Sequence, residues 1–167
     1  MSALPMRPFM LADTPRLQDL FAQSIEDLTQ DEYDEDQRIA WITRAADAET
    51  FAKRLGGNLT ILVEQDGDIL GFASLKDNKE IDMLFVHPFA TGQGVGSALV
   101  DALERLATAR GAEALSVDAS DTAHDFFANR GYAEVRRNSI PIDNVWVSNT
   151  TMTKPLARPE AGAGRSH

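Results

Sequence analysis

A glycine-rich segment between an apolar strand and an amphipathic helix sets the tightest constraint on how this 167-residue chain can fold. Residues Ile81–Val100 read IDMLFVHPFATGQGVGSALV, in which Gly92, Gly94 and Gly96 alternate where the loop turns into the helix. Glycine lets the backbone approach a ligand closely, and the first turn of a helix presents unpaired N–H groups at the positive end of its dipole. The pattern predicts a cradle for an anion, most often a phosphate or pyrophosphate, with a ligand-free tight turn as the simpler alternative.

Two other phosphate-binding loops fit the segment less well. A nucleoside-triphosphate loop needs a lysine before its final Ser or Thr, whereas here Ser97 follows Gly96 directly and the loop holds no lysine. A dinucleotide-binding loop needs G-x-G-x-x-G straight after a strand, whereas this chain has G-x-G-x-G after an intervening HPFAT. Because Asp118 ends the next apolar run, a dinucleotide-binding oxidoreductase stays open as an alternative.

The segment resembles the acetyl-CoA-binding motif of the GNAT superfamily of N-acetyltransferases. In that family a strand of the form L-x-V-x-P precedes a loop of the form [Q/R]-x-x-G-x-[G/A]. Leu84–Pro88 matches the strand and Thr91–Gly96 occupies the loop. A second family pattern, A-x-x-[F/L]-Y-E-x-x-G-[F/Y], is similar to Ala123–Tyr132. The order and spacing of the elements agree over roughly Met6 to Leu156.

The resemblance implies an α+β fold with a mixed, mostly antiparallel central sheet, a splayed pair of parallel strands and flanking helices. The acetyltransferase domain is expected to span residues 1–156, followed by a disordered tail over 157–167. Strands are predicted over Met6–Met10, Asn58–Glu64, Ile69–Lys76, Ile81–Val86, Ala114–Asp118, Tyr132–Asn138 and Val145–Lys154. Helices are predicted to follow a cap at Asp13 and to cover Gln37–Leu55, Gly94–Arg110 and Thr122–Arg130.

Acetyl-CoA is the cosubstrate that the resemblance implies, with its pantetheine arm between the splayed strands. A backbone N–H near Phe85 or Val86 is expected to stabilise the developing oxyanion. Ser120 is expected either to bond the pantetheine amide or to start the following helix. The expected CoA-binding residues are Leu84, Phe85, Val86, Thr91, Gly92, Gln93, Gly94, Val95, Gly96, Ser97, Ser120 and Phe127.

Three carboxylates are candidates for taking the proton of an ammonium substrate, whose pKa is about 10. Asp82 lies within the apolar run Ile81–Val86, where a carboxylate is unusual. Glu80 lies on the same face and falls where the resemblance places a general base in some members. Asp118 ends the neighbouring strand. For each, the alternative is a charge that is merely solvated at a strand end or a buried acceptor with a structural role.

Two residues depart from the family patterns. Thr91 stands where an Arg or Gln is usual, which removes one expected phosphate contact. Phe127 replaces a Tyr that often protonates the departing thiolate, so water, Tyr33, Tyr132 or His124 would supply that proton, although Tyr132 is expected in the core. These departures leave a catalytically silent CoA-binding module as an alternative to an enzyme.

The expected acceptor is a primary amine of a small molecule or peptide. The aromatic residues Tyr33, Trp41 and Trp146 and the acidic run Asp31–Asp36 lie in the segments that should select it, and they suit an organic ammonium. Trp41 is also a candidate for the core.

Composition excludes several other classes of protein. A net charge of −10 argues against general nucleic-acid binding, and the absence of cysteine excludes disulfides, thiolate metal sites and a cysteine nucleophile. With only three histidines, no metal site is expected. No stretch approaches the ~20 apolar residues of a membrane span and no signal pattern opens the chain, which favours a cytoplasmic protein. A homodimer through the C-terminal strands is compatible with the sequence.

Overall fold

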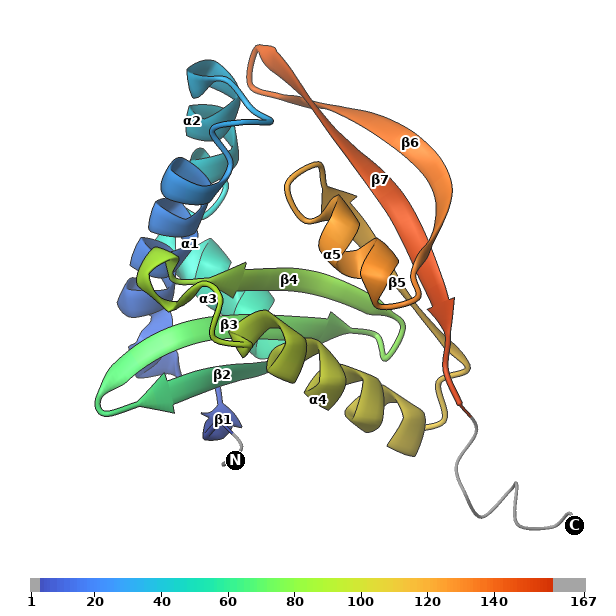
Figure 1. The fold of residues 1–167 in the computed structure, drawn as a ribbon. Coiled ribbons are helices and arrows are strands. Elements are labelled where there is room, and N and C mark those ends of the chain that lie inside the picture. Colours follow the sequence, from blue (N-terminus) through green and yellow to red (C-terminus); the bar gives the residue numbers. More distant parts are fainter. Residues whose placement is uncertain (1–3, 158–167) are drawn as a thin grey trace, which may run out of the picture.

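A computed structural model describes residues 4–157, in which seven strands form one sheet in the order β1-β2-β3-β4-β5-β7-β6. All neighbouring strands are antiparallel except β4 and β5, which run parallel as predicted. Residues 158–167 of the predicted tail lie outside the described residues. The strands are β1 (Met6–Pro8), β2 (Leu59–Gln65), β3 (Asp68–Lys76), β4 (Glu80–Val86), β5 (Ala114–Ser120), β6 (Ala133–Ile142) and β7 (Val145–Pro155) (Figure 1).

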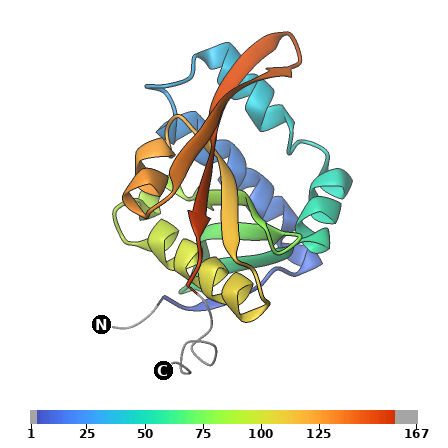
Figure 2. The same ribbon diagram turned by 90° about the vertical axis from the view of Figure 1, so that its right-hand side faces the viewer.

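Helices cover both faces of the sheet, which confirms the predicted α+β class. Leu99 and Leu103 of α4 and Phe127 of α5 pack on one face, whereas Leu17 of α1 and Phe51 of α3 pack on the other. Figure 2 shows α4 and α5 on one side of the strands and α3 on the other. The helices are α1 (Thr14–Leu28), α2 (Glu35–Thr43), α3 (Ala48–Gly57), α4 (Val95–Ala109) and α5 (His124–Asn129), with short 3₁₀ turns η1 (Leu11–Asp13) and η2 (Pro88–Ala90).

The single helix predicted over Gln37–Leu55 is wrong, because the chain forms two helices there. The helix α2 ends at Thr43, and α3 begins at Ala48 after an N-cap at Asp47. The Asp47 carboxylate accepts the backbone N–H of Thr50 at 2.9 Å, which satisfies a donor that a continuous helix would have paired internally. The apolar spacing hides this break, since each short helix keeps its own apolar face.

Asp13 is the N-cap residue of α1, as predicted, but its carboxylate is used elsewhere. The Asp13 side chain makes no capping bond to α1; it accepts the N–H of Met10 and two bonds from the Arg7 guanidinium, at 2.8 and 2.9 Å. These bonds hold the pKa of the buried Asp13 carboxyl below its usual value. Asp13 therefore fastens β1 to the start of the first helix.

The helix α4 lies so close to β3 that only glycine fits at position 71. A Cβ on Gly71 would lie 2.8 Å from Val95 Cγ1 and 3.0 Å from the backbone oxygen of Phe85. We expect Gly71→Ala to lower the free energy of unfolding by about 1–3 kcal/mol, measured by urea denaturation. Gly56→Ala is the matched control, since no atom lies within 4 Å of that Cβ position. Equal stability of the two variants would contradict the close contact.

Candidate active site

The parallel strands β4 and β5 separate shortly after they meet. They share two register pairs, Glu80 with Ser116 and Ile81 with Val117. Although both strands continue, no other pair joins them in the described part of the chain. In Figure 1, β5, β6 and β7 turn away from the half of the sheet formed by β1 to β4. The predicted splay is therefore present.

A β-bulge at Asp82 lies where the two strands diverge. Across β3, Leu75 is paired with Ile81 and Ser74 with Met83, so that Asp82 has no partner there. A bulge bends and twists its strand locally. The bend turns the carboxyl end of β4 away from β5 and opens the sheet.

A cavity of about 280 Å³ lies between the diverging strands. Helices α1 to α3, α5 and the β6–β7 hairpin complete its walls. Of the predicted cofactor residues, Leu84, Phe85, Ser120 and Phe127 line it, and so do all three candidate carboxylates, Glu80, Asp82 and Asp118. Its only cationic side chains among residues 4–157 are those of Arg44 and Arg54, neither of which was predicted.

A series of aromatic rings lines the same cavity as the carboxylates. Tyr33 lies edge-on to Trp41 with ring centroids 5.4 Å apart, and Trp41 lies 6.2 Å from Phe85. Phe21 of α1 completes the series at 4.6 Å from Phe85. Trp41 is only partly buried, so it lines the site as well as supporting the core. Trp146, predicted in the same role, is 62% exposed and does not line the cavity.

The Asp82 carboxylate is fully engaged by neighbouring groups. Arg54 donates to it from Nε at 2.7 Å and from Nη2 at 3.1 Å, and Asn58 donates from Nδ2 at 3.0 Å. Both oxygens of the carboxylate are therefore occupied by donors from α3 and from the residue that follows it.

Glu80 presents a different environment. Its carboxylate has no hydrogen bond or ion pair to a described residue, and it is partly buried in the cavity wall. Burial raises the Glu80 pKa above its usual value, and the nearby charges of Asp118 and Asp82 raise it further. Asp118 itself is exposed and accepts the Thr151 hydroxyl at 2.6 Å. Of the three carboxylates, Glu80 combines burial with an unoccupied acceptor.

Backbone N–H groups of β4 also face the opening. The His87 N–H donates to Leu70 O at 2.8 Å, and bonding alternates along an antiparallel ladder. It follows that the N–H of Phe85 faces β3, whereas those of Leu84 and Val86 face the gap toward β5. Of the two donors that the sequence suggested, the register thus favours Val86.

The glycine loop that ends in α4 has the open backbone that an anion cradle requires. Gly92 and Gly94 have positive φ angles of 79° and 81°, and no atom lies within 4 Å of either Cβ position. The first bond of the helix runs from the N–H of Ala98 to Gly94 O, leaving the preceding N–H groups at the open end. The side chain of Val95 is buried, so only its backbone faces outward.

The other predicted loop contacts are partly occupied within the loop itself. The Thr91 hydroxyl donates to Pro88 O at 3.1 Å, and Gln93 Nε2 donates to Phe89 O at 3.2 Å. Gly96 and Ser97 begin α4 and are partly buried. These bonds link the two side chains to backbone oxygens of the same segment.

None of the three side chains suggested as proton donors lies free beside the cavity. Tyr132 is buried in the core, as expected, and its hydroxyl donates to Glu104 at 2.8 Å. His124 contacts Glu134 outside the cavity. Tyr33 lines the cavity, but its hydroxyl donates to the backbone oxygen of Ser148 at 2.6 Å, and burial raises its pKa to about 12.

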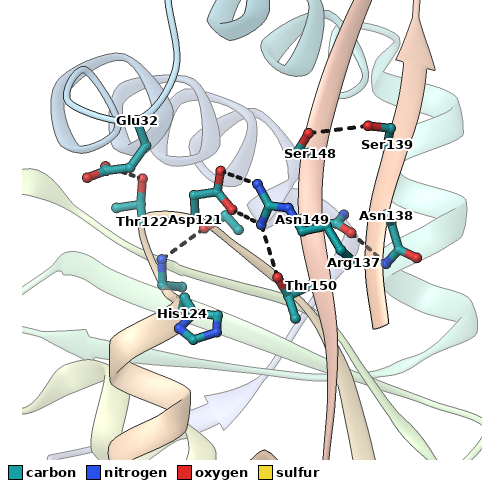
Figure 3. A network of polar contacts seen from close by, with 12 residues as sticks. Glu32, Asp121, Thr122, His124, Arg137, Asn138, Ser139, Ser148, Asn149 and Thr150 are labelled. Atoms are coloured by element: carbon teal, nitrogen blue, oxygen red, sulfur yellow. Dashed lines mark hydrogen bonds and ion pairs between the residues drawn. The ribbon is translucent and has the colours of Figure 1, made fainter. Parts of the chain in front are cut away.

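A polar network joins the β6–β7 hairpin, the end of β5 and the loop after α1 (Figure 3). Arg137 of β6 binds Asp121 after β5 and donates to Thr150 of β7 at 3.0 Å. Thr122 donates to Glu32, in the loop after α1, at 2.7 Å. The hairpin and that loop are thereby held against the end of β5. Ser120 accepts the N–H of Ala123, the N-cap residue of α5, at 3.1 Å, and it also lines the cavity.

Comparison with known proteins identifies the family. A family model described as an acetyltransferase (GNAT) domain matches residues 29–156, well over half of the chain. The chain belongs to the GNAT acetyltransferases. It is therefore an acyltransferase, and the resemblance drawn from its two motifs is confirmed. The match gives no support to the alternative interpretation of the chain as a dinucleotide-binding oxidoreductase.

Individual relatives agree with this assignment. An uncharacterized N-acetyltransferase, YafP of Escherichia coli K12, is 28% identical over 152 residues, which cover 91% of this chain and 96% of that protein. A crystal structure of a GCN5-related N-acetyltransferase, also described as a class-II aminotransferase, from Rhodopseudomonas palustris is 50% identical with a TM-score of 0.91. That match covers 93% of this chain and 98% of the other.

A more distant structure shares the fold alone. The PaiA N-acetyltransferase of Thermoplasma acidophilum, solved in complex with coenzyme A, is 20% identical with a TM-score of 0.75, over 93% of this chain and 100% of that one. Separately, the helices among residues 4–157 include none with the length and apolar character to cross a membrane.

Proposed function

We propose that this GNAT acetyltransferase moves an acetyl group from acetyl-CoA directly to a primary amine of a small molecule or peptide. The observation that carries the proposal is the cavity between β4 and β5. The cavity is lined by an unpaired carboxylate, Glu80, and by Leu84, whose N–H faces the gap between the strands as the N–H of Val86 does. A proton acceptor and an oxyanion-stabilising donor are the two groups that acyl transfer to an amine requires.

The glycine loop fits acetyl-CoA, which when bound supplies the activated acetyl thioester. Gly92 and Gly94 leave their Cβ positions open, and the first turn of α4 points its N–H groups outward at the positive end of the helix dipole. Residues 92–97 would hold the pyrophosphate through their backbone. The unpaired edge of β4, at Leu84 and Val86, would hold the pantetheine arm as an added strand does. The coenzyme A complex of the PaiA N-acetyltransferase supports this assignment through its shared fold.

Glu80, rather than Asp82, is the group we propose to accept the proton of the ammonium. Its raised pKa brings it closer to neutral pH, where a general base works best, and no described side chain competes for its oxygens. Asp82 is committed to Arg54 and Asn58, so we assign it to positioning. Because Phe127 is buried at the usual tyrosine position and carries no proton to give, water protonates the departing thiolate.

Thermal unfolding with added nucleotides tests the cosubstrate. A ligand at about 100 times its dissociation constant stabilises the folded chain by roughly 2.7 kcal/mol, which is a shift of several degrees for a domain of this size. We expect that shift with acetyl-CoA and with CoA, and none with NADH at the same concentration. The proposal would be contradicted by a shift with NADH alone, or by the absence of a shift with both acetyl-CoA and CoA.

A further inference from the structure

Arg44 is the one cation of the cavity wall without a partner among residues 4–157. Arg54, the other guanidinium of the wall, is paired with Asp82 at 2.7 Å. Arg38, on the same helix as Arg44, is paired with Glu26 at 3.5 Å. Arg44 ends α2, is exposed, and lines the cavity that also holds Glu80. Its donors are therefore available to a molecule in the cavity.

We propose that the amine acceptor is a free amino acid with an apolar side chain, whose carboxylate binds Arg44 while its amine faces Glu80. This inference rests on the proposed acetyl transfer and names its substrate class. A guanidinium presents a planar fork of donors that matches a carboxylate in two parallel bonds. The acceptor thus meets one group of each sign in the same cavity, as a zwitterion requires.

The rest of the acceptor would meet an apolar surface. Ile142 of β6 and Val147 of β7 line the cavity together with Trp41, and the first two are 9% and 6% exposed. The Ile142 and Val147 side chains offer no hydrogen bond to a polar substituent, whose burial against them would cost free energy. An aliphatic or aromatic side chain is the substituent that this wall accommodates.

Charge separates the amino acid from the two other classes of amine. The second ammonium group of a diamine would face Arg44, and like charges repel. A peptide N-terminus has an amide where the amino acid has its carboxylate, and it would leave Arg44 unpaired. A zwitterion carries no net charge, so the chain's net charge of −10 does not hinder its approach as it would hinder an anion.

Steady-state release of CoA thiol tests the substrate class with matched compounds. Leucine, methionine and phenylalanine are each compared with their amides and with the amines left by removing the carboxylate, and putrescine represents the diamines. We expect the best acceptor to be an amino acid, with a kcat/KM at least about tenfold above those of its amide and amine. Amides or amines that are acetylated equally well would overturn this inference and leave the acetyl transfer standing.

The variant Arg44→Gln tests the residue. It should lower the ratio of kcat/KM for the amino acid to that for its decarboxylated amine by about tenfold or more, and Arg44→Lys should restore part of the ratio. The matched control is Lys53→Gln, an exposed cation of α3 outside this cavity, which should leave the ratio unchanged. A ratio that Arg44→Gln does not change would overturn the assignment. Failure to acetylate any amine would instead overturn the proposed function, and this inference with it.

Discussion

Replacing Gly94 by valine should abolish measurable binding of acetyl-CoA, as followed by isothermal titration calorimetry. Gly94 has a φ of 81° at the N-cap of α4, a conformation that is a steric outlier for a β-branched residue. The valine side chain would also enter the open space in front of the first helical N–H groups. Backbone distortion and steric block act in the same direction, which is why this is among the largest effects expected.

A second glycine of the same geometry provides the control. Gly67, in the turn between β2 and β3, has a φ of 86° and equally open surroundings, but it lies outside the loop 91–97. Gly67→Val should therefore lose a similar amount of stability while keeping the affinity of the unaltered chain for acetyl-CoA. The cradle assignment is refuted if Gly94→Val, shown to be folded by circular dichroism, binds as tightly as Gly67→Val.

Glu80→Gln should lower kcat by roughly 10²–10⁴, the range typical of losing a general base, with little change in acetyl-CoA affinity. The substitution keeps the size of the side chain and removes only its ability to take a proton. Asp82→Asn is the comparison, because it disturbs the pair with Arg54 and leaves the Glu80 carboxylate in place. We expect Asp82→Asn to reduce stability more than Glu80→Gln does, and turnover less. If Asp82→Asn instead has the lower kcat of the two variants, the role of general base belongs to Asp82.

The variant Glu80→Gln should also change the pH dependence of kcat/KM. A base must be ionised to act, so kcat/KM should fall as the pH drops through the pKa of Glu80. That pKa is raised by burial and by Asp118 and Asp82, which places the acid limb of the profile above the usual range of a glutamate. In Glu80→Gln the limb should disappear from the residual activity. If the acidic limb of the profile is unchanged in Glu80→Gln, a group other than Glu80 is responsible for that limb.

The motifs that sequence analysis located are those set by local chemistry. The loop at Gly92 and Gly94 needs positive φ angles, which mark glycines in the sequence itself. The alternation in β4 placed Glu80 and Asp82 on one face, and both line the cavity. The parallel pairing of β4 and β5 could be predicted because a helix connects them, and a helical crossover between neighbouring strands makes them parallel.

The features that sequence analysis missed depend on contacts between distant segments. Nothing near Asp82 in the sequence shows that Arg54, 28 residues earlier, holds its carboxylate. Arg44 was hidden because one continuous helix was expected across the break before Asp47. The overlooked signal was Asp47 itself, an N-cap residue whose carboxylate accepts the Thr50 N–H. The β6 strand also runs on to Ile142, beyond the predicted Asn138, which brings its apolar end into the cavity wall.

Mass spectrometry of the reaction mixture tests the central claim most directly. The purified chain is incubated with acetyl-CoA and a panel of primary amines that includes amino acids, diamines and a peptide, in parallel with Glu80→Gln. We expect a product heavier by one acetyl group and an equal amount of free CoA. The rate of product formation should be strongly reduced in Glu80→Gln. Absence of any acetylated amine, in a sample shown by calorimetry to bind acetyl-CoA, would contradict the central claim.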